Sequence, residues 1–321
     1  MHNRTLQYLT VCRSAAMGVC IIWIMLFHST IPAPDNKILL SLWYVFVSFG
    51  GGCGVNIFLL LSGFGLMYSA KKRGSEIEWK SWGRKRLVRI LPAYIIVSTL
   101  YYVVKGYGFA DLLYNVSFVS FLIEGVRDFW YIFAILFCYA TFPIISKLYN
   151  TYNAHHVTLL SLIVLFVLNC CISVFMPEVY AHIEIFTQRI YCFAIGCYFA
   201  FLFYEGKVHL YNAITIVSLV LSIILYVVHP KFIGSDRIFF ICLSIPFLQL
   251  MNVMINFLSA KLNNLLSYFG NRSLELYLVH VSFGVLAANS LSNFSLSLIV
   301  YFMLSILLAE LTYRLVNKIK S

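Results

Sequence analysis

Apolar runs of about 20 residues recur along the whole chain, and each is long enough to cross about 30 Å of hydrocarbon. Hydrophobic residues fill 61% of the 321 positions and charged residues only 11%, whereas about a quarter of a typical soluble domain is charged. Because backbone polar groups in hydrocarbon must be hydrogen-bonded internally, such runs predict helices. The chain is therefore expected to be all-α, a polytopic transmembrane helical bundle.

The pattern predicts about ten spans with short connections, so one transmembrane domain is expected over residues 1–321. The ten predicted spans are residues 7–29, 42–69, 87–106, 129–149, 157–176, 188–205, 208–229, 237–257, 271–288 and 293–315.

Charge predicts the orientation of these spans. With the N-terminus in the cytoplasm, the cation-rich loop between the second and third spans also lies inside, which satisfies the positive-inside rule. Both termini are then cytoplasmic. The net charge of +11 is concentrated at span ends, which indicates membrane lipids and not nucleic acid as partners. The nine cysteines show no metal-ligand spacing, so no metal is expected.

Ionisable residues within spans are candidate functional residues because burying them in a membrane is costly. His28 ends the first span and is a candidate general base, or an interfacial histidine wetted by headgroups. His280 lies near the middle of its span, where it has a catalytic role or hydrogen-bonds a neighbouring helix. Arg13 precedes His28 by fifteen residues on nearly the same helix face. It either lines a passage with His28 or extends to the cytoplasmic interface.

Two polar residues, Asn56 and Ser62, interrupt an apolar run that is rich in glycine. Small residues allow helices to approach closely, and glycines also allow a backbone to unwind beside a cavity. Both explanations stay open for the glycines. Asn56 and Ser62 are candidate catalytic residues.

A cationic loop leads into the third span, where Arg86 and Arg89 are three residues apart on one helix face. Orientation and anionic lipid explain most of these cations. The position of the two arginines at the membrane entrance also suits a clamp on a phosphate group, with Lys85 beside them. Trp130 and Tyr131 begin the fourth span and either form an interfacial aromatic belt or stack on a sugar.

Five segments then occur in an order and spacing that resemble a known family. They are Phe27-His28, Gly54-Val55-Asn56-Ile57-Phe58 to Ser62-Gly63-Phe64, Arg86-x-x-Arg89-Ile90-x-Pro92, Trp130-Tyr131 with the later Phe142-Pro143, and Tyr277-Leu278-x-His280. Together they resemble the motifs of the acyltransferase 3 family, membrane acyltransferases that modify bacterial surface glycans. Two positions depart from the family pattern. Met17 stands where the family has a basic residue, which leaves Arg13 as the nearest cation, and Asn56 replaces an aspartate.

The resemblance implies a multi-pass O-acyltransferase of the bacterial cytoplasmic (inner) membrane, with acetyl-CoA as the expected donor. The expected acceptor is a surface glycan or lipid-linked glycan. In this scheme His28 is the base, assisted by Asn56, Ser62 or His280. The phosphates of coenzyme A are bound by Lys85, Arg86 and Arg89, with the family's basic role carried to Arg13, and Trp130 and Tyr131 border the acceptor opening. The alternatives are a transporter, flippase or exporter in polysaccharide assembly, and a non-catalytic accessory member of the family.

Overall fold

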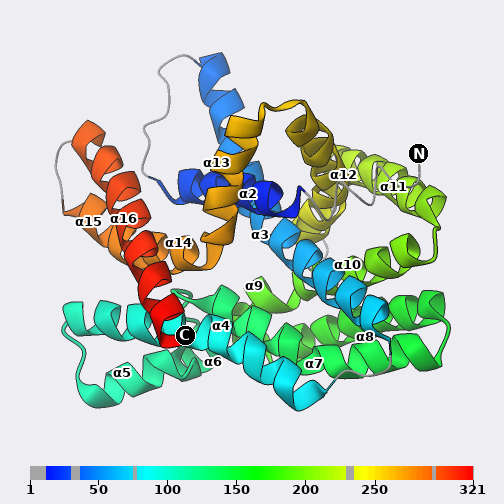
Figure 1. The fold of residues 1–321 in the computed structure, drawn as a ribbon, viewed down its shortest axis with the longest axis horizontal. Coiled ribbons are helices and arrows are strands. Elements are labelled where there is room, and N and C mark those ends of the chain that lie inside the picture. The colour runs from blue at the N-terminus through cyan, green and yellow to red at the C-terminus, as the bar shows by residue number, and fades with distance from the viewer. Residues whose placement is uncertain (1–11, 30–36, 75–77, 229–234, 291–293, 321) are drawn as a thin grey trace.

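The computed structural model describes residues 12–29, 37–74, 78–228, 235–290 and 294–320 (Figure 1). These residues are almost entirely helical and include no strand, which confirms the all-α prediction. The helices are α2 (Arg13–His28), α3 (Lys37–Arg73), α4 (Trp79–Val104), α5 (Phe109–Val116), α6 (Val119–Glu124), α7 (Trp130–Thr151), α8 (Ala154–Phe175), α9 (Pro177–Thr187), α10 (Ile190–Tyr204), α11 (Val208–Val228), α12 (Ser235–Phe257), α13 (Ala260–Asn271), α14 (Ser273–Val279), the π-helix η1 (His280–Gly284), α15 (Val285–Asn289) and α16 (Phe294–Lys320).

Eight helical segments among the described residues are long and apolar enough to cross a membrane. They are α3, α4, α7, α8, the combined α9–α10 segment, α11, α12 and α16. Two shorter apolar helices, Arg13–His28 and Ser273–Ala287, occupy the positions of the first and ninth predicted spans. The count of ten therefore stays a prediction. Both chain termini, and the predicted span ends at residues 7, 229 and 293, lie outside the described residues.

Helix α3 occupies the centre of the molecule and packs against α2, α10 and α12 (Figure 1). Glycines of α3 and of α10 explain how these two helices come so close. A Cβ atom on Gly63 would overlap the carbonyl oxygen of Phe193 in α10, and one on Gly196 would overlap that of Leu60 in α3. Helix α3 is continuous through its glycines, so at these positions they serve close helix packing and not unwinding.

The outer helices expose apolar side chains, as expected for a protein solvated by lipid. In α8, Leu159 and Leu160 are exposed, and in α11 so are Ile216 and Val217. Such exposed apolar faces are unfavourable in water, because each square ångström of apolar area costs about 25 cal/mol to expose. The protein is an integral, multi-pass membrane protein.

The helix after α13 is interrupted at a chemically informative point. Helix α14 ends at Val279, and residues His280–Gly284 continue as one π-helical turn before α15. Such a turn inserts an extra residue into the helix and is frequent at functional sites. It lies directly beside α16, where a Cβ on Gly284 would collide with the hydroxyl of Ser305 and press tightly against the ring of Tyr301.

Candidate active site

A cavity of about 310 Å³ runs between α2, α3, α4, α7 and the α13–α14 segment. Its lining is partly polar and partly aromatic. Arg13, Arg89 and Asn271 supply polar groups, whereas Phe58, Tyr131, Tyr139 and Tyr277 supply aromatic ones. Ile24, which also lines it, is one helical turn from His28. The cavity therefore extends from arginine side chains towards the predicted catalytic histidine.

Arg13 reaches this cavity from the first turn of α2, and its guanidinium lies against Gly65 of α3. Nε of Arg13 is buried, and within the described part of the chain it has no hydrogen-bond partner. Met17, one turn further along α2, lines the same cavity. Arg13 can thus present a cation to the space that a basic residue at position 17 would face.

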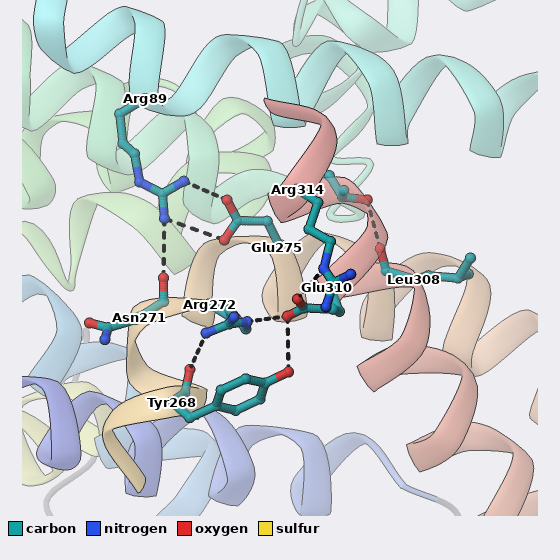
Figure 2. Close-up of polar contacts among 9 residues, drawn as sticks. Arg89, Tyr268, Asn271, Arg272, Glu275, Leu308, Glu310 and Arg314 are labelled. Atoms are coloured by element: carbon teal, nitrogen blue, oxygen red, sulfur yellow. Dashed lines mark hydrogen bonds and ion pairs between the residues drawn. The ribbon is translucent and has the colours of Figure 1, made fainter. Parts of the chain in front are cut away.

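Arg89 also lines the cavity, but it already has a carboxylate partner (Figure 2). Its guanidinium forms a bidentate ion pair with Glu275 of α14, in which Nη2 lies 3.3 Å from Oε2. Nη2 also donates to the backbone oxygen of Asn271 at 3.3 Å. Glu275 is completely buried, whereas the side chain of Arg89 is 37% exposed. The pair joins α4 to α14 beside the cavity.

A second ion network lies next to this pair (Figure 2). Glu310 of α16 accepts hydrogen bonds from Arg272, from Arg314 at 2.6 Å and from the hydroxyl of Tyr268 at 2.9 Å. The guanidinium of Arg272 stacks 3.7 Å from the ring centroid of Tyr268. The network links α13, the start of α14 and α16, and so holds this end of the cavity together.

The other two predicted donor-binding cations occupy different places. Arg86 is half-buried, with its guanidinium 5.8 Å from the ring of Trp82, and among the described residues it has no carboxylate partner. Lys85 is exposed. Neither of them lines the cavity. Arg86 is therefore available to an anion approaching the cavity from outside, while Lys85 faces the surroundings.

His28 and His280 meet where α2 ends and η1 begins. Nε2 of His280 lies 3.3 Å from Nδ1 of His28, and the two ring centroids are 5.2 Å apart. His280 is completely buried, whereas His28 is exposed. Tyr277, a cavity residue, packs its ring 5.8 Å from that of His280. The structure thus brings together the two histidines that the sequence singled out, next to the cavity.

The hydrogen bonds around the pair define which nitrogens carry protons. Nδ1 of His280 lies 2.8 Å from the carbonyl oxygen of Leu276, which can only accept, so Nδ1 carries the hydrogen. Nε2 of neutral His280 is then an acceptor. Nδ1 of His28 faces this acceptor and also the carbonyl oxygen of Ile24 at 3.1 Å, so it must be a donor. Nε2 of His28 is left unprotonated, which is the form that a general base requires.

Ser62 and Asn56 lie on different faces of α3. Ser62 lines the cavity with Val55 and Phe58. Asn56 does not line it; it belongs to the stripe with Leu60 and Gly63 that packs towards α10. Its side chain is 1% exposed, and within the described part of the chain Oδ1 has no hydrogen-bond partner. The structure thus places Ser62 with the cavity and Asn56 behind it.

Trp130 and Tyr131 begin α7 inside the bundle. Trp130 is 9% exposed, and Tyr131 lines the cavity, where its backbone N–H lies 3.3 Å from the hydroxyl oxygen of Tyr277. Burial of Trp130 argues against a simple aromatic belt at the membrane surface.

A buried cation that sequence reasoning missed, Arg189, stacks 5.2 Å from the Trp130 ring. It is the second residue of the span predicted over 188–205, where an arginine looks like an ordinary span end.

The sequence that forms this cavity can be compared with the sequences of known protein families. A family model described as an acyltransferase domain, that of acyltransferase 3, matches residues 16–314. The chain belongs to the acyltransferase 3 family. The match covers nearly the whole chain, including both histidines and every cavity residue except Arg13 and Ser14. No curated protein and no solved structure matches the chain.

Membership identifies the protein as a membrane acyltransferase and favours that function over the transporter alternative. An acyltransferase needs a donor site, an acceptor site and a group that removes a proton from the acceptor. The cavity, its arginines and the His28–His280 pair are candidates for the first and third of these requirements.

Proposed function

We propose that the protein transfers an acyl group, expected to be acetyl, from coenzyme A to a hydroxyl group of a surface or lipid-linked glycan in the bacterial cytoplasmic membrane. The observation that carries this proposal is the position of the His28–His280 pair just beyond a cavity that has arginines among its lining. An acyl-CoA donor carries phosphates at one end and a thioester at the other. Its phosphates suit the arginines of the cavity, and its thioester suits the end near the histidines.

The donor enters from the cytoplasmic side, where the charge bias places the cationic loop. Its phosphates bind Arg86 and Arg89 at the entrance to α4, with Lys85 adding positive charge. The pantetheine arm extends past Arg13 along the cavity. Arg13 and His28 are fifteen residues apart on α2, about 22 Å along the helix axis, so an extended arm is needed to bring the thioester to the histidine.

His28 Nε2 accepts the proton of the acceptor hydroxyl as its oxygen attacks the thioester carbonyl. A C–O bond forms, the C–S bond breaks, and the departing thiolate of coenzyme A takes the proton from His28. The acceptor approaches from the outer side, past Trp130 and Tyr131, and the exposure of the His28 side chain leaves it open to an acceptor.

His280 holds His28 in the tautomer that leaves Nε2 free. Ser62 faces the cavity, where its hydroxyl can donate a hydrogen bond to the bound donor. Asn56, behind this face, supports α3 from the α10 side.

The test is release of coenzyme A by the purified protein in detergent, with and without glycan from its own cells. Acceptor-dependent release is expected for the unaltered protein and not for His28→Ala, which should still insert into the membrane. His209→Ala, a change at an exposed histidine of α11, serves as the matched control. Full activity of His28→Ala would refute the mechanism. Glycan movement into proteoliposomes of the purified protein, without release of coenzyme A, would indicate a transporter. Mass spectrometry of surface glycan from cells with and without the protein then identifies the acyl group.

A further inference from the structure

Arg189 is the most deeply buried arginine among the described residues outside the cavity. It directly precedes α10, and its side chain is 5% exposed. Nη1 donates to the backbone oxygen of Ile185 at 3.0 Å, whereas Nε is buried and makes no hydrogen bond within the described part of the chain. No carboxylate among the described side chains lies within ion-pair distance of it. A buried guanidinium with so few partners is costly unless another group compensates its charge.

Two further arginines lie close to Arg189. Arg127 and Arg237 both approach Glu184 of α9, at 3.5 Å and 4.0 Å. Both arginines are near enough to Arg189 to repel its charge, and Glu184 is near enough to attract it. Their side chains are 42% and 27% exposed. The three residues together, which we call the α9 arginine site, have an accessible rim in Arg127 and Arg237 and a buried base in Arg189.

The α9 arginine site is connected to the catalytic histidines by packed aromatic rings. Arg189 stacks on Trp130, whose ring contacts that of Tyr131 at a centroid distance of 6.1 Å. Tyr131 in turn contacts Tyr277 at 5.2 Å, and Tyr277 contacts His280. The arginine site therefore contacts Trp130, which the proposed function places at the acceptor opening.

We propose that the α9 arginine site binds an anionic oxygen group of the acceptor, with Arg189 as its principal ligand. This inference rests on the proposed function for the identity of the ligand as acceptor. A guanidinium presents paired N–H donors that match carboxylate and phosphate oxygens, and it binds them most strongly where water is excluded. The anionic group is either the carboxylate of an acidic sugar or the phosphate of a lipid-linked glycan, and it lies apart from the hydroxyl that is acylated.

Binding to the full-length protein in detergent tests this without turnover. Isothermal titration calorimetry is carried out at saturating coenzyme A, so that the donor arginines are occupied. The probes are a hyaluronan tetrasaccharide, which carries carboxylates, and inorganic pyrophosphate; chitotetraose is the neutral control. Arg189→Met should weaken binding of one anionic probe by about tenfold or more, because a charge-assisted contact is lost. Arg73→Met, at the exposed last residue of α3, is the matched control and should leave probe binding unchanged.

Each outcome has a defined meaning. Loss of hyaluronan binding in Arg189→Met assigns the site to an acidic sugar, and loss of pyrophosphate binding assigns it to a phosphate. If neither anionic probe binds, or if Arg189→Met binds both as the unaltered protein does, the inference is wrong. Should Arg189→Met fail to fold, Glu184→Gln decides: removing the competing carboxylate should tighten anion binding, and unchanged or weaker binding contradicts the site.

These measurements are independent of catalysis. If His28→Ala retained full activity, the proposed mechanism would fail while the anion site could still be measured. If coenzyme A release were normal and anion binding did not depend on Arg189, only the acceptor site would fail.

Discussion

Nδ1 of His28 lies 3.3 Å from Nε2 of His280, although the two residues are 252 positions apart in the chain. The contact requires the end of α2 and the π-helical turn η1 to meet, and it fixes the tautomer of both rings through the carbonyl oxygens of Leu276 and Ile24. His280 is thus a positioning residue for the base and does not itself need to touch the acceptor.

Replacing His280 by Ala should therefore lower kcat by about 10²-fold, the lower end of what general-base catalysis supplies, while the KM for the donor changes little. The fall occurs because His28 can then rotate or adopt the other tautomer. His280→Gln, whose side-chain oxygen can accept from Nδ1 of His28, should recover part of the activity. Steady-state kinetics of coenzyme A release measure both effects. An equal loss in both variants, or a change confined to KM, would contradict the positioning role.

The ion pair between Arg89 and Glu275 gives a second prediction. Glu275→Gln replaces a buried carboxylate by a neutral amide and weakens the bond between α4 and α14, which should cost about 1–3 kcal/mol of stability. The same change frees the guanidinium of Arg89 for donor phosphates, so coenzyme A should bind more tightly. Thermal unfolding in detergent and calorimetry measure the two quantities. Weaker coenzyme A binding in a stable Glu275→Gln protein would show that Arg89 needs Glu275 to position it for phosphate.

Much of the architecture was predictable because hydropathy dictates it. The all-α class and the approximate positions of the spans follow from apolar length alone, and motif order indicated the family that the family model confirms. Helices α5 and α6 were not predicted, because they are only eight and six residues long and lie in what hydropathy treats as a loop. Helix α9 was also missed, since its residues precede the apolar run of α10.

The site was predictable only in part, because sequence spacing carries no information on which spans are neighbours. His28 and His280 were both selected, but their contact depends on the packing of α2 against α14. The sequence also contains several acidic residues, and spacing alone does not show that Glu275 is the one that pairs with Arg89. Arg189 was missed because an arginine before an apolar run is the ordinary pattern of a span end, and only its burial beside Trp130 distinguishes it.

A third prediction concerns Arg13 and Met17, which both line the cavity from neighbouring turns of α2. Arg13→Met should raise the KM for acyl-CoA by about tenfold, because one charge-assisted contact is lost. The double change Arg13→Met with Met17→Arg should restore much of the affinity, since it places a guanidinium at the position where the family has a basic residue. Arg73→Met is again the control. Failure of the double variant to improve on Arg13→Met would mean that the cavity needs its cation at the depth of Arg13.

The packing of α3 against α10 supplies the last prediction. A Cβ atom on Gly63 would overlap the carbonyl oxygen of Phe193, so Gly63→Ala must push two central helices apart. Overpacking of this kind costs about 1–3 kcal/mol, and more where the obstructing atom belongs to a helix backbone. Gly83→Ala in α4 is the matched control, because nothing lies within 4 Å of its added Cβ, and alanine should stabilise that helix by about 0.5–1 kcal/mol. Thermal unfolding followed by tryptophan fluorescence should show a lower midpoint for Gly63→Ala and an equal or higher one for Gly83→Ala. Equal midpoints for Gly63→Ala and the unaltered protein would contradict the close contact between α3 and α10, on which the position of the α9 arginine site also depends.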